Sequence, residues 1–483
     1  MPKNHTKGTI KNLFLFFLLI ISLVLLAVFR IDIWMILSVL IWGIMIFVCL
    51  KDISINGFFL FFLFSFFVFL MSGDIAEALF DKHYHLQFGK EATLHAHKSI
   101  FISLLAMWIG YAFTKSKQKK TTSYVVPSNN SNITVGAIKS ISKWVYMVAY
   151  FFIVINTLDT IRFVASYGYV AYYTSFNPIL PSILVEVGEF TPLALCVYLS
   201  TFPTKKESSL IIKSFLLYSL LTLFIGSRSG IIYNTAFIIC YALYRNHTDK
   251  GKETWISKRL IIALLVSIPF LLSFLFLYEY IRTGRDIEYT SLGDSIVDFF
   301  VNIGASSKVI KYGYEYSNNI PKLKFYSFGK TFNYFKYGRL FNLFNLRSIP
   351  NRHTATFALE SHSFADLISY LAMPQKYLQG HGEGSSFIAE LFADFGYIGV
   401  ALGGAIYGWI FKKMAYISNR HWLSTTLKLF IFFTMLSAPR DSFDGFIAAI
   451  LNINNMLLIF LIYFISQSIS KRTKEIERLN KLR

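Results

Sequence analysis

Charged residues are scarce in this chain of 483 residues. Asp, Glu, Lys and Arg make up 15% of it, against about 25% in a typical soluble domain. Hydrophobic residues make up 54%, and Phe alone occurs 50 times, which excludes an intrinsically disordered chain. The 47 Lys and Arg residues lie in short clusters between long apolar runs. Because a nucleic-acid binder needs a continuous basic surface, we expect no nucleic-acid partner.

Cysteine and several motifs of enzyme chemistry are also rare or absent. The three cysteines (Cys49, Cys196 and Cys240) lie inside apolar runs, so we expect packing residues and no disulfide. No Walker A motif occurs, so we expect no nucleotide hydrolysis. We expect neither a cofactor nor a metal ion. The histidines of the first sizeable outward loop form only a loose cluster, with no cluster of cysteines or carboxylates nearby: His83, His85, His95 and His97.

Long apolar runs are abundant. A membrane-spanning helix needs about 20 mostly apolar residues, and twelve runs approach that length: 12–29, 33–50, 57–72, 98–114, 140–157, 180–202, 210–226, 229–244, 260–278, 385–411, 426–439 and 443–467. The first is longer than the apolar part of a signal peptide and no cleavage site follows it, so we interpret it as a span. The sequence predicts an all-α polytopic membrane protein with about twelve transmembrane helices.

Basic residues indicate the orientation of these spans. Clusters of Lys and Arg at 115–120 and 471–483 favour the cytoplasmic side. We therefore expect a bacterial inner-membrane protein with both termini in the cytoplasm. Its expected parts are helices one to nine in 1–278, a large outward, periplasmic loop in 279–384, helices ten to twelve in 385–470, and a basic cytoplasmic tail in 471–483. So long a loop is usually functional or disordered, and the aromatic content of this one favours an ordered subdomain with short helices.

Several arginines lie beside spans on the outward side, where an ionisable group is costly and often functional. Arg228 lies in the turn between spans seven and eight. Arg282 and Arg285 follow Tyr280 where span nine ends, and Arg440 lies between the last two spans. Arginine binds phosphate oxygens through planar, bidentate contacts. The structural alternatives are anchoring at the membrane surface for the first three, and a local pair with a neighbouring aspartate for Arg440.

Carboxylates and a histidine accompany these arginines. His381 and Glu383 lie in the Gly-rich lead into span ten, and Glu390 lies about 6–8 Å into that helix, at about 1.5 Å per residue. Each of the three is a candidate general base, although Glu383 could simply be solvated in a loop. Glu189 shares a face of span six with Glu186, where pairing with an arginine is the alternative. Together these residues predict an outward-facing site for an anionic, lipid-attached substrate, with pyrophosphate as the natural candidate.

Two glycine pairs follow Glu390 in the same span. Gly399–Gly403 and Gly404–Gly408 are each separated by three residues. Small residues at this spacing allow helices in a membrane to approach closely. We expect these glycines to serve packing and not a binding site.

At this point the arrangement resembles the O-antigen polymerase (Wzy) family. Three segments carry the resemblance: GSRSG at 226–230, YIRTGR at 280–285, and GEGSSFIAELFADFGYIG at 382–399. The last is the most specific, because the family is similar in having a Gly-rich lead into Ser-Phe-x-x-Glu and then Phe-Gly-x-x-Gly. The segment IPNR at 349–352 is similar to a family Ile-Pro-Arg motif with one residue inserted.

The resemblance implies a helical fold similar to the GT-C class and glycosyl transfer at the outer face. Donor and acceptor would both be glycans on undecaprenyl pyrophosphate, and the partners would include membrane lipids and a chain-length-regulating co-polymerase. Arg282 and Arg285 would hold the pyrophosphate, with Arg228 and Arg440 in support. An O-antigen ligase-like transferase uses the same donor and is the nearest alternative. A repeat-unit flippase is a second one, against which the long loop and the one-sided charges argue.

Overall fold

The computed structural model describes residues 31–80, 88–114, 129–248, 253–283, 291–337, 351–415 and 421–482, together with Phe17, Ile20, Ile21 and Val24. Within these ranges the chain forms helices and no strand. Ten of the helices are long and apolar enough to cross a membrane. The prediction of an all-α polytopic membrane protein is therefore confirmed.

Most expected spans correspond to one of these ten candidates, with different ends. The run 98–114 belongs to α5 (Lys90–Phe113), and 140–157 to α6 (Asn129–Tyr167). The run 443–467 is divided between α22 (Gly445–Leu451) and α23 (Ile453–Leu482), because Asn452 caps the second helix with its side-chain oxygen. The run 229–244 forms α11 (Ser229–Thr248), which is not among the ten. Apart from the four positions named above, the run 12–29 lies outside the described residues.

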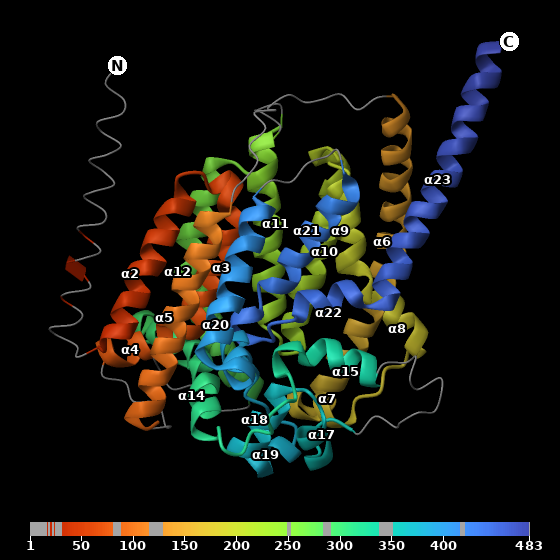
Figure 1. Cartoon of the computed structure of the whole chain (residues 1–483). Coiled ribbons are helices and arrows are strands. Elements are labelled where there is room, and N and C mark those ends of the chain that lie inside the picture. Colours follow the sequence, from red (N-terminus) through yellow and green to blue (C-terminus); the bar gives the residue numbers. More distant parts are fainter. Residues whose placement is uncertain are drawn as a thin grey trace, which may run out of the picture. The chain divides into compact units, whose positions relative to one another are not determined.

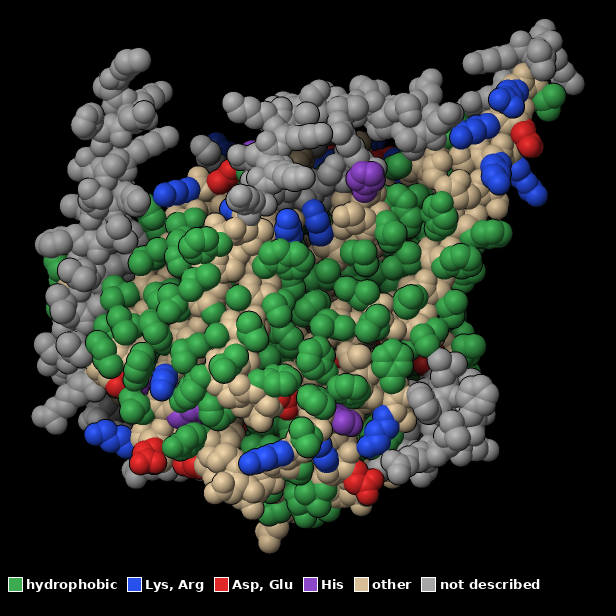
Figure 2. Space-filling view, in the orientation of Figure 1, with side chains coloured by type: hydrophobic (Ala, Val, Ile, Leu, Met, Phe, Trp, Pro, Cys, Tyr) green, Lys and Arg blue, Asp and Glu red, His purple; other side chains and the backbone are tan. Residues whose placement is uncertain are grey.

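The apolar helices present hydrophobic side chains outward. On α12 (Lys258–Thr283) a row at helical spacing is exposed, with Ile262 at 61%, Val266 at 63% and Phe270 at 63%. Figure 2 shows hydrophobic side chains over much of the visible surface of the helices, and charged side chains mainly toward the helix ends. Exposed apolar rows of this kind match a lipid environment and not water.

The chain divides into two compact units. Unit 1 comprises 1–115, 257–415 and 436–444, and unit 2 comprises 116–256, 416–435 and 445–483. The long helices of unit 1 are α2 (Ile33–Leu50), α3 (Ile53–Leu70), α5, α12 and α20 (Phe387–Met414). Its shorter elements are α4 (Ser72–Phe80), α13 (Leu292–Gly304), η1 (Ala305–Ser307), α14 (Lys308–Glu315), η2 (Tyr326–Phe328), α15 (Gly329–Tyr337), α17 (Ala355–Glu360), α18 (Phe364–Ala372), α19 (Pro374–Leu378) and η3 (Ala438–Arg440).

Unit 2 is built around α6, which packs against α8 (Ser182–Glu189), α9 (Thr191–Ser200) and α23. The remaining elements are α7 (Tyr169–Ser175), α10 (Lys205–Phe224), α11, α21 (Trp422–Met435) and α22. Hydroxyl pairs join some of these helices, for example Thr426 Oγ1 to Ser200 Oγ at 2.9 Å.

The closest helix pair of unit 1 is α5 with α20, and glycine makes it possible. A Cβ at Gly404 would lie 2.6 Å from the carbonyl oxygen of Ser103, and one at Gly408 would lie 2.0 Å from that of Met107. The predicted packing role of this glycine pair is confirmed. Because no side chain fits at either position, the backbones of α5 and α20 come into direct contact.

The other predicted pair, Gly399 and Gly403, packs mainly inside α20, and a Cβ at Gly403 would lie 2.3 Å from Leu391 Cδ1 and 3.2 Å from the Phe443 ring. Gly396 has φ 61° and ψ −154° and breaks the helix into two parts, a conformation open to glycine but strained for other residues. Beyond this break, a Cβ at Gly399 would lie 2.5 Å from the carbonyl oxygen of Leu391. The break places the first part of α20, which carries Glu390, close to the shorter elements of unit 1.

Several of these shorter elements gather at one end of the long helices of unit 1. α14 packs against α5, α18 and α20, and α13 packs against α3 and α4 (Figure 1). We call this end the capped end of unit 1. It is where α2 and α20 begin and where α3 ends.

Candidate active site

An extended stretch of chain joins α19 to α20 at the capped end. We call residues 381–386 the closing segment. The backbone N–H of Glu383 donates to Ser369 Oγ of α18 at 2.9 Å. The Glu383 carboxylate forms an ion pair with Lys308 of α14. Gly384 follows with a φ of 83°, so the chain turns there in a way that favours glycine.

Arg440 lies next to the closing segment. A Cβ at Gly384 would be 3.8 Å from the carbonyl oxygen of Arg440. The Arg440 side chain is exposed, and its guanidinium carbon lies 5.9 Å from the centre of the Phe69 ring. The neighbouring Asp441 pairs with Lys330 of α15 at 2.7 Å. Within the described part of the chain Arg440 has no carboxylate partner, so the local pair considered from the sequence is not adopted there.

Glu390 lies in the first turn of α20 and is only 2% exposed. Its Oε1 accepts a hydrogen bond from Ser385 Oγ at 2.6 Å, and its Oε2 accepts one from the backbone N–H of Phe443 at 2.9 Å. Both oxygens are therefore engaged in joining the closing segment to the turn that follows η3. This geometry suits a positioning residue better than an accessible base.

The turn after η3 holds a second buried carboxylate. Asp444 accepts a hydrogen bond from the backbone N–H of Thr331 at 2.7 Å. Burial raises the pKa of Asp444, although the Thr331 amide opposes the shift. Together with the pair between Lys330 and Asp441, this contact attaches α15 to the turn that carries Arg440.

A buried network of charged groups lies close to the closing segment, and sequence reasoning missed it. His97 of α5 contacts two carboxylates, Asp74 of α4 through Nε2 at 2.8 Å and Asp32 at the start of α2 through Nδ1. Lys311 of α14 donates to Asp74 Oδ1 at 2.7 Å. Burial alone would raise the pKa of Asp74, but the Lys311 ammonium and the His97 ring outweigh it and hold that pKa below its usual range. Asp74 is therefore an ionised carboxylate at neutral pH.

The network and the closing segment are connected through α14. Lys311 and Lys308 are three residues apart on this eight-residue helix, so they lie on neighbouring positions of one face. Lys311 contacts Asp74 of the bundle, and Lys308 contacts Glu383. One short helix thus sets the distance between the buried network and the closing segment.

Arg352 is held in place by Asp366 of α18. Its Nε donates to Asp366 Oδ1 at 3.0 Å, while 57% of the side chain stays exposed. Tyr377 OH donates to the same carboxylate oxygen at 3.2 Å. Burial lowers the pKa of the adjacent His353, and the charges of Arg352 and His381 contribute to that shift. His381, at the start of the closing segment, is exposed and close to this group.

The arrangement can bind an anion and accept a proton. Lys308 pairs with Glu383 of the closing segment, Arg440 adjoins Gly384, and Arg352 lies with His381 around His353. A cationic group in such a place stabilises negative charge on a phosphate group. Glu383 is a carboxylate within the same stretch and could take a proton from a hydroxyl group.

Part of the predicted site lies outside the residues that the structure describes. Arg282 lies in the last turn of α12 with Tyr280, but the structure does not describe either side chain, and Arg285 lies outside the described residues. His83 and His85 are also outside them. His95 and His97 were expected in a loop and lie inside α5, which starts at Lys90. Among the described residues no group of three or more His, Cys, Asp or Glu could hold a metal ion.

The other two predicted residues belong to unit 2. Arg228 lies in the turn between α10 and α11, two residues after Gly226, whose φ is 100°. Glu189 ends α8 and is exposed. Burial raises the pKa of Tyr172 on α7, and the nearby Glu189 carboxylate adds to this shift. Arg228 and Glu189 therefore belong to unit 2, whereas the closing segment belongs to unit 1.

Comparison with known proteins decides the family. The family model described as O-antigen polysaccharide polymerase Wzy matches residues 10–473. The chain belongs to the Wzy family. As a Wzy family member it is a membrane polymerase of O-antigen repeat units, with a glycosyltransferase-like activity. No curated protein and no solved structure matches it significantly.

Within this Wzy chain, the residues that sequence reasoning missed share one property. Asp32, Asp74, Lys308 and Lys311 carry charge directly beside apolar helices, but each finds its partner far away in the sequence. The pair of Lys311 with Asp74 spans 237 residues. The available signal was the position of Asp32 and Asp74 next to apolar runs, because a charge at such a place needs a partner.

Proposed function

We propose that this Wzy chain joins repeat units carried on undecaprenyl pyrophosphate, at the periplasmic face of the inner membrane. The capped end of unit 1 would hold the reacting groups. The observation that carries this proposal is the row of cations, Lys308, Arg352 and Arg440, along a closing segment that contains Glu383. The family assignment supplies the polymerising activity, and this row suits a pyrophosphate group.

The reaction forms one glycosidic bond and breaks one bond to phosphate. A hydroxyl oxygen of the acceptor glycan attacks the anomeric carbon of the donor, and the bond from that carbon to the donor's pyrophosphate oxygen breaks. Negative charge develops on the departing lipid pyrophosphate, where cationic side chains lower the barrier. The proton of the acceptor hydroxyl passes to a general base.

Glu383 is the best candidate for this base. Its carboxylate is paired only with Lys308 among the described residues, whereas both oxygens of Glu390 are engaged in structural hydrogen bonds. A Lys308 ammonium that turns toward the pyrophosphate would free Glu383 to accept the proton. His381 is exposed and is the second candidate. Glu390 then has a positioning role, since it joins Ser385 of the closing segment to Phe443 in the turn after η3.

Each of these cations would bind some of the pyrophosphate oxygens. Arg440 and Arg352 stay charged at any working pH and offer several N–H donors each. Asp366 engages Nε of Arg352, and 57% of the side chain stays exposed. Part of the guanidinium is therefore open to a ligand. Arg282, Arg285 and Arg228 remain proposals from the sequence for the same substrate, as does Glu189.

A deletion strain tests the proposal. It would carry the wild-type gene, Arg440→Gln or Lys308→Gln, with Lys376→Gln of α19 as a matched control that removes an exposed positive charge near the closing segment. We expect the long surface-polysaccharide ladder with wild type and Lys376→Gln. We expect a single repeat unit capped onto the lipid core with the other two variants, at equal protein abundance.

Two outcomes would contradict the proposal. Loss of even the single capped unit would indicate a failure of transport or ligation and favour a flippase or a ligase. A normal ladder in both Arg440→Gln and Lys308→Gln would remove these cations from the site.

A further inference from the structure

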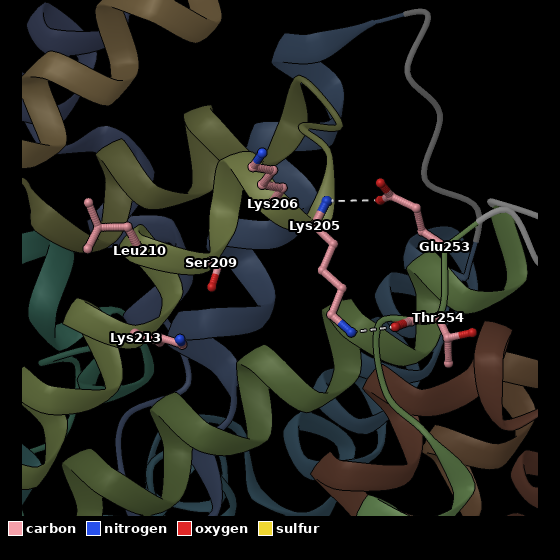
Figure 3. A pocket seen from close by; sticks show the side chains of 7 residues that line it. All are labelled: Lys205, Lys206, Ser209, Leu210, Lys213, Glu253 and Thr254. Atoms are coloured by element: carbon pink, nitrogen blue, oxygen red, sulfur yellow. Dashed lines mark hydrogen bonds between the residues drawn. The ribbon is translucent and has the colours of Figure 1, made fainter.

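A basic pocket lies in unit 2, on elements that the proposed reaction does not use. It is formed at the start of α10 together with residues 253 and 254, and has a volume of about 750 Å³ (Figure 3). Its lining consists of Lys205, Lys206, Ser209, Leu210, Lys213, Glu253 and Thr254. Three of these seven residues are lysines, and only one is acidic.

One of the three lysines is used to build the pocket. The backbone N–H of Lys205 donates to the Glu253 carboxylate at 2.9 Å, and Lys205 Nζ donates to the carbonyl oxygen of Thr254 at 2.6 Å. Figure 3 shows both contacts. They fasten the segment before α12 to the start of α10, and they engage the pocket's one carboxylate with a backbone donor.

The other two lysines are available to a ligand. Lys206 and Lys213 are exposed, and among the described residues neither has a carboxylate partner. The nearest acidic residue on the helix, Glu207, is already paired with Lys139 at 2.7 Å and closes the N-terminal cap with Thr204. The pocket therefore carries uncompensated positive charge.

These lysines lie at the start of a continuous exposed face of α10. Lys206, Ser209 and Lys213 lie at helical spacing on it, with Leu210 exposed by 62% among them. Three further side chains continue the same face toward the other end of the helix: Leu217 at 53%, Leu220 at 45% and Phe224 at 63% exposed. The whole helix is a candidate membrane span. One face thus offers charge at one end and apolar surface along the rest.

We propose that this face binds an anionic phospholipid. The phosphodiester of the headgroup lies between the ammonium groups of Lys206 and Lys213 and accepts a hydrogen bond from the Ser209 hydroxyl. The acyl chains follow the apolar side chains of α10. Lys213 lies about 12 Å along the helix from its start, at about 1.5 Å per residue, where a charge is costly without a partner.

The shape of the face distinguishes a lipid from a soluble anion. Inorganic phosphate would bind the lysines but would leave the adjoining apolar side chains uncovered. A phospholipid covers both, and basic pockets on the cytoplasmic side of membrane helices suit anionic headgroups. The orientation expected from the basic clusters gives the start of α10 to that side.

Native mass spectrometry of the full-length protein tests the site. Protein in detergent is mixed with equal amounts of phosphatidylglycerol and phosphatidylcholine. The wild type should retain phosphatidylglycerol in clear preference. The variant Lys206→Gln/Lys213→Gln should retain it about thirtyfold less, since each lysine at a membrane surface contributes about fivefold. The matched control Lys471→Gln/Arg472→Gln removes the same charge from exposed positions in the second half of α23 and should keep the preference.

Three further measurements decide what is bound. Lys206→Arg/Lys213→Arg should retain the lipid, because the charge is conserved. In the wild type a photoactivatable phosphatidylglycerol should cross-link to the peptide that contains residues 206–213, which needs no variant to fold. The proposal is overturned if the cross-link maps elsewhere or if the glutamine variant retains the lipid as the wild type does. It is also overturned if millimolar inorganic phosphate displaces the lipid, which would indicate a site for a free anion.

Discussion

Unit 1 holds two groups of charged side chains close together, and the two groups differ in exposure and in the number of their partners. In the buried network, Asp74 and His97 are surrounded by partners of opposite or complementary charge, and their side chains are 12% and 7% exposed. In the closing segment, Glu383 has one partner and Arg440 is exposed without a carboxylate among the described residues. The first arrangement surrounds each charge with partners, and the second leaves part of its charge exposed. Under the proposed function, the charges with several partners would hold the fold and those with few would meet the substrate.

The sharpest way to break this comparison is Asp74→Ala. The change leaves Lys311 and His97 buried without their shared carboxylate, which should lower the free energy of unfolding by about 3 kcal/mol. Thermal aggregation in detergent, followed by size-exclusion chromatography, measures it. Glu91→Ala removes an exposed carboxylate in the first turn of α5, outside the network, and serves as the control. An unchanged unfolding temperature in Asp74→Ala would mean that the network does not hold α14 to the bundle.

Glu383→Gln should have the next largest effect, on activity and not on stability. A general base contributes about a hundredfold or more to rate, whereas a single partly exposed ion pair contributes about 1 kcal/mol or less to stability. In membranes supplied with lipid-linked repeat units, we expect polymer formation to fall about a hundredfold while the unfolding temperature stays close to that of the wild type. Should His381→Gln abolish the reaction and Glu383→Gln leave it intact, the base is His381.

The pH dependence of stability separates the two groups of charges further. The pKa of folded Asp74 is below its ordinary value, so ionised Asp74 stabilises the fold above the unfolded pKa of about 3.9. That contribution, about 2 kcal/mol, is lost as pH falls through the lower, folded pKa. Wild type should therefore unfold at a higher temperature than Asp74→Asn at pH 7, and the difference should shrink as pH falls below about 4. A difference that is constant with pH would contradict the assignment.

Glu390→Gln should give a smaller and mixed effect. Glutamine keeps one acceptor but presents an NH2 group where Glu390 accepts from either Ser385 or Phe443. One lost hydrogen bond of this kind costs about 1.5 kcal/mol. We expect a lower unfolding temperature and a partial loss of polymerisation that follows the loss of folded protein. A full loss of activity in protein that unfolds like the wild type would make Glu390 a catalytic group.

Asp444→Asn should have the smallest effect. Burial raises the pKa of Asp444, so its ionised form costs stability at neutral pH, and the wild type should lose stability as pH rises through that pKa. Asparagine keeps an acceptor for the Thr331 amide and removes the charge. We expect a change within about 0.5 kcal/mol, in the direction of greater stability, by the same thermal measurement. A large loss would show that the carboxylate charge itself is needed.

The spans could be predicted from sequence because apolar runs of sufficient length have few other uses. Their ends could not. Hydropathy placed the start of the α5 region near residue 98, since His95 and His97 are polar, but the helix begins at Lys90 and His97 is buried against Asp32 and Asp74. A polar residue inside a helix is invisible to hydropathy when its partners come from other helices.

The candidate site was predictable in part for the same reason. Glu383, Glu390 and Arg440 attract notice because they lie beside or inside apolar runs, and the glycines around them suggest an unusual backbone. Their contacts do not follow from the sequence. The partner of Glu390 is a backbone N–H 53 residues later, and nothing in the sequence distinguishes Lys308 from other lysines of the long loop.

The contact between Asp74 and Lys311 has a consequence for how the protein is made. The two residues are 237 positions apart, so α4 is synthesised and inserted long before α14 exists. Until Lys311 emerges, the Asp74 carboxylate, two residues into α4, has only His97 as a close ionisable partner among the described residues. Chains terminated before α14 should therefore be poorly folded and open to proteolysis, because long-range contacts form last. The helices of unit 1 can therefore reach their final packing only after α14 has been synthesised.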